Sequence, residues 1–449
     1  MRVTTYVPVA FLRNFRYRFL MSLEYRHRKE TRIEPSLPGG FRDYGPEDAI
    51  ARDRMVAIIK QTFTSFGFDP LETPAAERTE VLTGGEEDSG KIIFNLKGSR
   101  AEKESSVSLR FDLTVPLARF VAAHPEIPKP FKRYQIGNVW RGESPQAGRY
   151  REFMQADVDI VGSSLPDADA EIISIIYGTL KNLGVEKFKI KINNRQYLDM
   201  LPECAQFHKK DLWDILRILD KHDKIGKEAA LDEVAQRFSV RIAHDIKSFL
   251  LASPLSREYE TGELHTITNR LIKEYEIENR YWEFDTWMVR GLSYYTGTIF
   301  ETILDDAPEI GSIFSGGRYD DLVSRFTGQK IPAVGASLGV DRLFAAMEEM
   351  QMSKKKSTLT EVLILNLGLS DEYPRLAKEL REHGINVALW LGDDTTMQAQ
   401  LAYALKKEIP YVLIYGSDEA SKKVVAIKNL QTREQKEIPR DQLTGYFQK

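Results

Sequence analysis

The sequence predicts an α+β core, an antiparallel sheet flanked by helices, which contains a helical insertion and is followed by a separate α/β domain. Three observations support this prediction. Strand patterns follow one another without regular βαβ spacing, charged helical segments replace them from about 201 to 276, and strands alternate with helices after residue 357. At about 100–200 residues per domain, 449 residues suffice for two to four domains.

Changes in composition divide the chain into four parts. Residues 1–35 form a basic N-terminal extension and residues 36–352 contain the α+β core with its insertion at about 201–276. Residues 353–357 are a polar linker, and residues 358–449 form the C-terminal α/β domain.

The N-terminal extension has no acidic residue before Glu24 and contains Arg2, Arg13, Arg16 and Arg18. Organellar transit peptides have this composition, but short basic ends are common for other reasons. A working start at Met21 or a disordered basic tail is the simpler interpretation. We therefore predict a cytoplasmic protein, with organellar targeting as the alternative.

Overall composition excludes several classes of protein. With 63 Lys and Arg against 66 Asp and Glu, the net charge of −3 provides no global positive field for nucleic acid or an anionic membrane. The single cysteine, Cys204, excludes an intramolecular disulfide and a cysteine-rich zinc site, which fits a reducing compartment. No run of about 18 apolar residues occurs, so the sequence predicts a soluble protein without a membrane span.

The first elements of the core are a helix and a short extended segment. Apolar residues at helical spacing over 47–66, closed by Gly67, predict a long amphipathic helix. The following "GFDPLETP" contains Pro70 and Pro74, which exclude a central strand and favour a sheet edge or an interface.

Further strands and helices follow in order. "KIIFNLKG" and "VSLRFDLT" predict a hairpin, and "KRYQIGNVWR" and "REFMQADVDIVG" predict strands on either side of the loop "GESPQAGRY". A helix is expected over 167–183. Beyond the insertion, strands return in "WEFDTWMVRGLSYYTGTIFETIL" and "SGGRYDDLVSRF", and "IPAVGASLGVDRLFAAMEEM" reads as a glycine-rich strand or turn entering an amphipathic helix.

The loop "WRGESPQAGRYREF" concentrates groups that suit a polyphosphate and a purine. The sequence contains neither a P-loop nor a G-x-G-x-x-G fingerprint, so arginines would have to hold any nucleotide. Arg141, Glu143, Arg149, Arg151 and Phe153 occur together, and the last three share one face of a strand. A solvated charged hairpin is the alternative for this segment alone.

Acidic and amide side chains gather at the ends of neighbouring strands. Asp112 and Thr114 follow one strand, and Gln155 and Asp159 share a face of another, together with Asp157, if no bulge intervenes. Taken singly, each is more often a capping or surface residue than a ligand. Their occurrence beside the arginine-rich loop favours a binding site.

These motifs identify a resemblance to the class II aminoacyl-tRNA synthetases and, among them, to the histidyl-tRNA synthetase family. "GFDPLETP", "WRGESPQAGRYREF" and "GASLGVDRL" resemble the three class II motifs in the expected order. "RGLSYYTGTIFE" and "SGGRYDDLV" resemble the two stretches peculiar to the histidine enzymes, although a surface turn before a strand is the alternative for the first of them. The resemblance covers about residues 36–449 and implies a class II synthetase-like fold.

The resemblance implies that the α-carboxylate of L-histidine attacks the α-phosphate of ATP, and that histidine then passes to the 3′ end of tRNA(His). Arg141 would hold the α-phosphate and Glu143 the adenine amino group, while Phe153 and Arg342 would stack on the two faces of adenine. Arg149 would reach the γ-phosphate. Mg²⁺ would accompany the ATP phosphates, and no protein metal ligand is expected. Gly339, three residues before Arg342, would allow the backbone to approach the nucleotide.

The resemblance also assigns a histidine pocket. Arg290 would hold the α-phosphate opposite Arg141 and belong to the histidine-binding residues, and Tyr294 would line the pocket. Asp159, Tyr295 and Tyr319 would bind the imidazole, because polar contacts to both ring nitrogens reject analogues that lack them. The α-ammonium group would be bound by Asp112, Thr114 and Gln155.

Three positions depart from the pattern of the family. Many members have Asp at Ser293 and Gly at Asp321, which puts the local geometry of the pocket in question. Bacterial relatives often have a second arginine at Ser144, so recognition of the extra 5′ nucleotide of tRNA(His) stays open.

The resemblance further implies a homodimer formed through the first motif, an insertion that contacts the tRNA acceptor arm, and a C-terminal domain that binds the anticodon. The alternative function is a non-catalytic regulatory subunit of ATP phosphoribosyltransferase, but such paralogues typically lack the anticodon domain and the catalytic arginines. A synthetase for another amino acid fits the pocket motifs less well. An RNA-binding stress sensor derived from a synthetase would normally sit beside a kinase domain, and this sequence shows none.

Overall fold

The computed structural model describes residues 33–84, 93–97, 106–143, 150–252, 262–289, 295–353 and 355–447. The N-terminal extension up to residue 32 lies outside this range. Residues 33–41, taken by themselves, contain no regular element other than a turn at Gly39 and Gly40.

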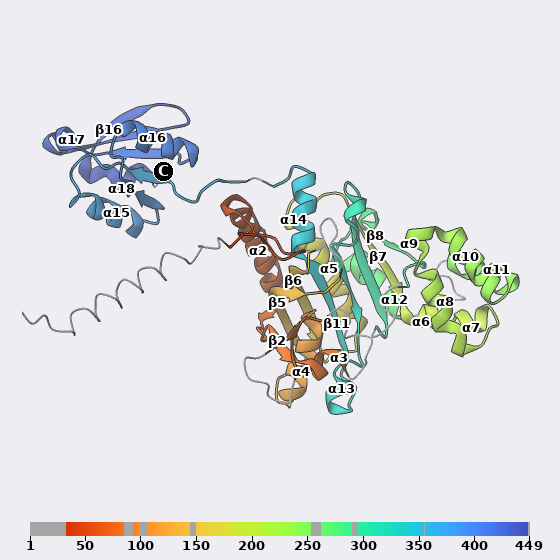
Figure 1. Cartoon of the computed structure of the whole chain (residues 1–449). Helices are drawn as coiled ribbons and strands as arrows, with labels where there is room; N and C mark the ends of the chain where they lie inside the picture. The colour runs from red at the N-terminus through yellow and green to blue at the C-terminus, as the bar shows by residue number, and fades with distance from the viewer. Residues whose placement is uncertain are drawn as a thin grey trace, which may run out of the picture. The chain divides into compact units, whose positions relative to one another are not determined.

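One large sheet forms the centre of the core (Figure 1). Its eight strands lie in the order β1, β5, β6, β11, β10, β9, β7, β8. All neighbours are antiparallel except at the two edges, where β1 pairs with β5 and β7 with β8 in parallel, so the predicted antiparallel sheet is confirmed for the central strands. The strands span Asp69–Pro70 (β1), Phe131–Trp140 (β5), Glu152–Val161 (β6), Phe188–Asn194 (β7), Trp282–Phe284 (β8), Thr298–Leu304 (β9), Phe314–Arg318 (β10) and Ala333–Gly339 (β11).

The β5 and β6 hairpin determines which side chains share a face. The two strands pair in continuous register from Phe131 opposite Val161 to Trp140 opposite Glu152, without a bulge. Since side chains alternate along a strand, Gln155, Asp157 and Asp159 lie on one face. The predicted strands on either side of the second motif and their shared polar face are therefore confirmed.

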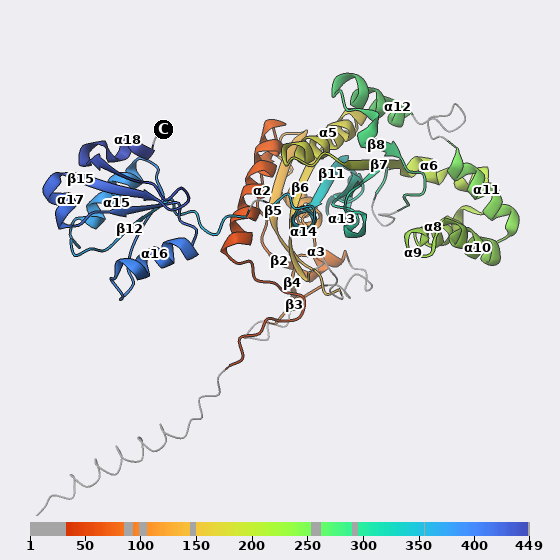
Figure 2. The same cartoon turned by 90° about the horizontal axis from the view of Figure 1, so that it is seen from above.

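Two long helices cover one face of the sheet. Helices α2 (Pro46–Ser65) and α5 (Pro166–Asn182) lie side by side against β5 and β6 (Figure 2). Met55, Ile59 and Phe63 of α2 are buried in the same hydrophobic core as the isoleucines of α5. The first helix ends as the sequence predicts, because Gly67 has a φ of +76° and donates its N–H to Thr64 O at 2.9 Å.

A small second sheet lies beside the end of β5, where Trp140 N donates to the carbonyl oxygen of Arg110, the residue after β4, at 2.9 Å. It contains β2 (Ala76–Arg78), β4 (Val107–Leu109) and β3 (Asn95–Leu96), paired antiparallel in that order. The predicted hairpin is confirmed in its pairing, although its strands are shorter than expected, and its linker lies outside the described residues. Helices α3 (Thr79–Thr83), α4 (Thr114–Ala123) and α13 (Ser324–Thr327) lie near it, whereas α14 (Val340–Glu349) packs on β6 and β11 of the large sheet (Figure 1).

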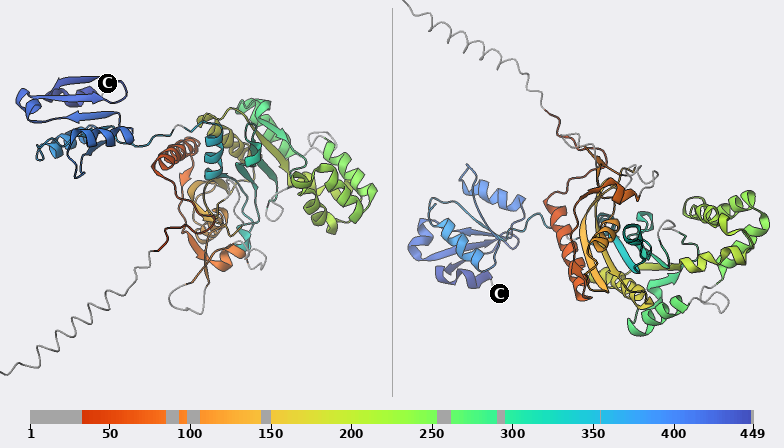
Figure 3. Two further views of the ribbon diagram at one scale, coloured as in Figure 1. Left: turned by 45° about the horizontal axis from the view of Figure 1, so that its top comes forward. Right: turned by 90° about the horizontal axis from the view of Figure 1, so that it is seen from below.

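The short helices of the insertion pack on one another (Figure 3). They have their own hydrophobic core, in which Leu216, Leu219 and Ile246 are buried together with Trp287 of the segment that returns to the large sheet. Helical structure extends slightly beyond the predicted N-terminal boundary, because Asn194 caps the next turn through a bond from Gln196 N at 2.7 Å. The elements are α6 (Arg195–Asp199), α7 (Leu201–Cys204), α8 (Leu212–Leu219), α9 (His222–Ile225), α10 (Lys227–Arg237), α11 (Val240–Leu251), α12 (Gly262–Asn269) and a π-helical turn at Arg270–Glu274.

Residues after the linker form a five-stranded sheet in the order β13, β12, β14, β15, β16. The first three strands are parallel and the last two antiparallel, so the predicted βαβ alternation holds for the first half of this sheet. Alternate residues of β12 and β14 belong to two separate cores, one with α15 and α18 and the other with α16. The bounds are Val362–Ile364 (β12), Tyr373–Glu382 (α15), Val387–Leu389 (β13), Met397–Lys406 (α16), Tyr411–Ile414 (β14), Ser417–Lys422 (α17), Val424–Asn429 (β15), Gln435–Pro439 (β16) and Leu443–Phe447 (α18).

Across the described ranges, none of the helices combines the length and the apolar character needed to cross a bilayer.

Removing the Phe63 side chain tests the packing of α2 on the sheet. Phe63 is fully buried and its ring centroid lies 5.9 Å from that of Tyr134 of β5. Phe63→Ala should lower the free energy of unfolding by about 3–5 kcal/mol, since it removes buried surface and leaves a cavity. Lys60→Ala, at an exposed position of the same helix, should change it by less than about 0.5 kcal/mol. Denaturant unfolding followed by tryptophan fluorescence measures both, and equal effects would contradict the packing.

Candidate active site

Two adjoining cavities open where β6, β10 and β11 lie side by side. The first chamber has a volume of about 200 Å³ and the second about 340 Å³. Because five residues line both chambers, they form one continuous site. The shared residues are Arg141, Glu143, Gln155, Ser315 and Ser337.

The first chamber is rich in carboxylates and hydroxyls. Three aspartates, Asp112, Asp157 and Asp159, line it with the phenol rings of Tyr295 and Tyr319, and the shared residue Glu143 is a fourth carboxylate. Such a lining suits a small cation that also offers further hydrogen-bond donors. Its other residues are Phe111, Thr114, Gly316, Gly335 and Ala336.

An ion pair lies at the base of the first chamber. Arg133 of β5 is fully buried, and its Nη2 lies 2.8 Å from Oδ2 of Asp159, directly opposite it on β6. Arg133 also donates to Leu113 O at 3.2 Å. Burial raises the pKa of Asp159, while Arg133 and the hydrogen bond from the Tyr319 hydroxyl oppose that rise. These contacts fix Asp159 in the wall of the chamber.

Glycines make room for Asp159. Gly335 of β11 pairs with Asp159, and a β-carbon on Gly335 would lie 1.9 Å from Asp159 Oδ1. A β-carbon on Gly316 would lie 2.2 Å from the Gly335 carbonyl oxygen. Both distances are far below a van der Waals contact, so only glycine lets the three strands and the carboxylate come this close.

Asp112 has a structural contact as well as a place in the chamber. Its Oδ1 accepts a hydrogen bond from Val115 N at 3.2 Å, which caps the start of α4. Burial raises its pKa to about 6, against the opposing effects of the Val115 hydrogen bond, Arg141 and Arg133. The capping interpretation of this residue and the binding interpretation are therefore compatible.

The second chamber combines guanidinium groups with an aromatic ring. Arg141 donates from Nε to Phe111 O at 3.0 Å, and its guanidinium lies 5.1 Å from the ring centroid of Phe153. Arg342, in the first turn of α14, donates to Ser312 O and lines the same chamber. A planar ring could stack between Phe153 and Arg342, and an anion could bind Arg141.

Asp341 joins three elements and the segment before α2 around the second chamber, and sequence reasoning missed it. Its carboxylate is buried and accepts from Met154 N at 2.7 Å and from the Tyr44 hydroxyl at 2.7 Å. It also pairs with Arg52 of α2 at 2.6 Å, and the Arg52 guanidinium lies 3.8 Å from the Tyr44 ring centroid. Asp341 thereby positions Arg342 relative to β6. The only signal in the sequence was its place beside Arg342.

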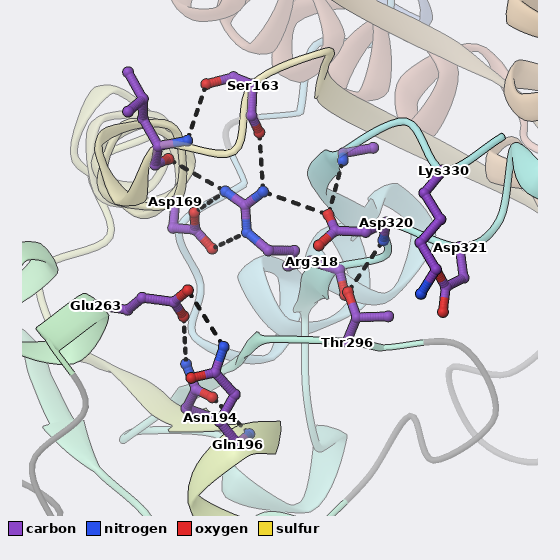
Figure 4. Close-up of polar contacts among 12 residues, drawn as sticks. Ser163, Asp169, Asn194, Gln196, Glu263, Thr296, Arg318, Asp320, Asp321 and Lys330 are labelled. Carbon is purple, nitrogen blue, oxygen red and sulfur yellow. Dashed lines mark hydrogen bonds and ion pairs between the residues drawn. The ribbon is translucent and has the colours of Figure 1, made fainter.

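A second buried arginine supports the wall of the first chamber (Figure 4). Arg318, the residue before Tyr319, pairs with Asp169 of α5 and donates to Ser163 O at 2.9 Å. Its neighbour Asp320 receives a hydrogen bond from Ala333 N at 3.1 Å and donates its own N–H to the Thr296 hydroxyl at 3.1 Å. These bonds hold the backbone on both sides of Tyr319 and next to Tyr295.

Most residues expected in the site meet in the two chambers. Asp112, Thr114, Gln155, Asp159, Tyr295 and Tyr319 line the first; Phe153, Gln155 and Arg342 line the second; Arg141 and Glu143 line both. Arg149, Arg290 and Tyr294 lie outside the described residues, as do Ser144 and Ser293. Asp321 contacts Lys330 at 2.8 Å and is absent from both linings. Residues that the sequence did not assign are Arg133, Asp157, Glu301, Ser315, Ser337 and Asp341.

Among the residues described here, no group of three or more His, Cys, Asp or Glu side chains could hold a metal ion. Glu301 of β9 and Glu143 are carboxylates of the second chamber. Mg²⁺ commonly binds one or two carboxylates together with substrate phosphates, so this lining fits an ion that arrives with a nucleotide better than a resident metal.

Family models and sequence relatives of this chain agree on one family. The histidyl-tRNA synthetase family matches residues 40–343, and the family described as anticodon binding domain matches residues 361–449. The chain is 37% identical over 437 residues to the histidine–tRNA ligase of Clostridium tetani and 39% identical over 437 residues to that of Wolinella succinogenes. In both comparisons the match covers 91% of this chain and 97% of the relative.

Solved structures give the same result for the fold. The crystal structure of histidyl-tRNA synthetase from Nostoc superposes with a TM-score of 0.81 at 30% identity, covering 93% of this chain and 99% of the other. An ATP phosphoribosyltransferase regulatory subunit/histidyl-tRNA synthetase from Bacillus halodurans superposes with a TM-score of 0.67 at 22% identity, covering 86% and 99%. The second likeness shows the shared fold alone.

Breaking the buried ion pair tests the base of the first chamber. Arg133→Met should lower the free energy of unfolding by about 3–5 kcal/mol, because it leaves Asp159 buried without its counter-ion. Adding Asp159→Asn should reduce the cost to no more than about 2 kcal/mol, since the unpaired charge is then absent.

Lys132→Met is the matched control on the same strand. Lys132 pairs with Glu171 at 2.7 Å at a partly exposed site, so its loss should cost at most about 1 kcal/mol. Denaturant unfolding measures all three variants. A double variant as unstable as Arg133→Met alone would contradict the proposed pairing.

Proposed function

The chain belongs to the histidyl-tRNA synthetase family, and from this premise we propose that the two chambers are the site at which it activates histidine with ATP and transfers it to tRNA. The enzyme is an aminoacyl-tRNA synthetase, a histidine–tRNA ligase. Arg141 supports the assignment of the site most directly, because it lines both chambers. An α-phosphate held there would lie between the amino acid and the adenine.

Histidine occupies the first chamber in this proposal. Asp159, held by Arg133, accepts a hydrogen bond from one ring nitrogen, and Tyr319 and Tyr295 complete the contacts to the imidazole. Burial beside Asp159 raises the pKa of Tyr319 well above its usual value, so its hydroxyl stays neutral. The α-ammonium group binds Asp112, Thr114 and Gln155, and the chamber of about 200 Å³ suits one small amino acid.

ATP occupies the second chamber. Adenine stacks between Phe153 and Arg342, and the Glu143 carboxylate accepts a hydrogen bond from its amino group. Gly339 allows the backbone to approach the nucleotide. Asp341 acts through Arg342 as a positioning residue, because its bonds to Met154 N and Arg52 fix the start of α14. Mg²⁺ bound to the phosphates would neutralise part of their charge, and Glu301 is the carboxylate of β9 that would hold it.

Activation proceeds by displacement at the α-phosphorus. A carboxylate oxygen of histidine forms a bond to phosphorus as the bond to the bridging oxygen of pyrophosphate breaks, which leaves histidyl-adenylate. Arg141 stabilises the negative charge on the α-phosphoryl oxygens, with Arg290 on the other side and Arg149 on the γ-phosphate as proposals from the motifs. Preorganised cations of this kind supply a large part of the acceleration.

Transfer follows when a ribose hydroxyl of the terminal tRNA nucleotide attacks the histidyl carbonyl carbon and AMP leaves. The C-terminal domain at residues 358–449, joined by the linker at 353–357, would bind the anticodon loop through base edges and stacking. The insertion at about 201–276 would contact the acceptor arm.

We also propose a homodimer formed through the first motif, because β1 is a two-residue strand at the edge of the large sheet. We also propose a cytoplasmic location, because a chain with a single cysteine, Cys204, fits a reducing compartment.

Amino-acid-dependent ATP–pyrophosphate exchange tests the function and distinguishes it from a regulatory subunit. Histidine alone among the standard amino acids should support exchange. Arg141→Ala and Arg290→Ala should each lower kcat/KM by at least about 100-fold, or about 2.7 kcal/mol. Arg54→Ala, at an exposed position of α2, should leave it unchanged. Absence of exchange with every amino acid would overturn the proposal.

Gly335→Ala tests which chamber binds histidine. The added methyl group would force Asp159 to move by about 1 Å or more, which can cost about 100-fold in reactivity. The KM for histidine in the exchange assay should rise by that order, with little change in the KM for ATP. Gly178→Ala is the control, since its β-carbon would meet nothing closer than 3.7 Å. If only the KM for ATP changed, histidine would bind outside the first chamber.

A further inference from the structure

Asp157 lies in the middle of the proposed histidine pocket without an assigned role. It is 2% exposed, lines the first chamber, and lies between Gln155 and Asp159 on the same face of β6. Within the described part of the chain, its Oδ1 has no hydrogen-bond partner. A buried carboxylate oxygen that faces a cavity without a donor is costly unless a ligand supplies one.

The groups around Asp157 do not compensate its charge. Gln135 of β5 and Ser337 of β11 are its neighbours in the sheet and are uncharged. Arg133, the cation that acts most strongly on Asp157, is already paired with Asp159. Two further carboxylates, Asp159 and Asp112, interact with Asp157 unfavourably.

The charge of Arg110 also attracts Asp157, but its guanidinium donates its hydrogen bonds to backbone oxygens of other residues. It donates to Thr73 O at 2.7 Å and to Asn138 O at 2.9 Å. Among the described residues, Asp157 therefore lies near two other carboxylates, those of Asp159 and Asp112. The two cations that attract it, Arg133 and Arg110, have other partners.

The expected response of such a site is to bind a proton. Burial, with the neighbouring charges of Asp159 and Asp112, raises the pKa of Asp157 to about 7, and Arg133 and Ser337 oppose the rise only in part. Near neutral pH, the pocket without substrate is then a mixture of protonated and ionised forms at this residue.

Resting on the proposed function, we infer that Asp157 is a further substrate-binding residue, which accepts a hydrogen bond from the α-ammonium group of histidine and releases a proton to solvent when histidine binds. The ammonium group keeps its three protons, and the proton that leaves is the carboxyl proton of Asp157. An ammonium group has three donors, and one N–H can be shared between two acceptors, so Asp157 can accept a hydrogen bond beside Asp112, Thr114 and Gln155.

The sign of the pH dependence follows from this exchange. Histidine binds the ionised form of Asp157, so affinity is lost as pH falls through the pKa of the empty pocket. Ionisation of Asp157 should therefore raise the affinity for histidine about tenfold between pH 6 and pH 8. Free imidazole also loses a proton, near pH 6.5, and contributes a smaller rise that does not depend on Asp157.

Calorimetric titration of histidine into the full-length chain tests the inference. At pH 7.0, in PIPES and in ACES, whose heats of ionisation differ, the dependence of the binding heat on the buffer gives the number of protons released. Wild type should release about half a proton more than Asp157→Asn, because a group of pKa about 7 is half protonated there. The affinity of the variant should also rise about tenfold less between pH 6 and pH 8.

Glu77→Gln is the matched control, because Glu77 is buried but paired with Arg119 at 2.8 Å, outside both chambers. It should release protons as wild type does. Equal proton release by wild type and Asp157→Asn would overturn the inference and leave the proposed function intact. Failure of wild type to bind histidine would overturn the proposed function itself.

Thermal unfolding without substrate separates binding from a structural role. The pKa of Asp157 is higher in the folded state, so its contribution to stability is lost as pH rises through about 7. At pH 8, Asp157→Asn should therefore melt at or above the temperature of wild type. A lower melting temperature, or failure to fold, would show that the carboxylate stabilises the fold and would overturn the inference.

Discussion

The buried ion pair between Arg133 and Asp159 constrains the rest of the site. A fully buried guanidinium is tolerated only with a counter-ion and hydrogen-bond acceptors, and a buried carboxylate needs the same in return. Both residues therefore require the register that places β5 opposite β6 without a bulge. The glycine at position 335 follows from this arrangement, because any side chain there would displace Asp159.

Charged residues also connect the two chambers. Arg141 lines both, while Asp341 connects the helix that begins at the second chamber to β6, α2 and Tyr44. Arg318 and Asp320 fix the backbone of the opposite wall. Buried charged residues thus orient three binding groups: Arg133 orients Asp159, Asp341 orients Arg342, and Arg318 holds the backbone before Tyr319. Rigid sites are usually supported in this way.

The aspartates Asp112, Asp157 and Asp159 of the first chamber lower the stability of the protein without substrate. Their raised pKa values reflect burial without enough positive charge. A substrate that brings an ammonium group supplies the missing charge, so the unfavourable arrangement becomes favourable on binding. Active sites commonly trade stability for function in this way.

The sequence by itself determined the elements and much of the site. The period of two along residues 152–161 predicts that Gln155 and Asp159 share a face, and the motifs predict Arg141, Phe153 and Arg342, because alternation and local turns depend on near neighbours in the chain. Only the tertiary structure decided that Asp341 bonds to Met154 N, 187 positions away, and that Arg133 pairs with Asp159. Pairings of this kind depend on strand order and helix placement, which no local pattern specifies. For Asp157 both contribute: alternation predicts its face, but only the tertiary structure buries it and leaves its Oδ1 without a hydrogen-bond partner among the described residues.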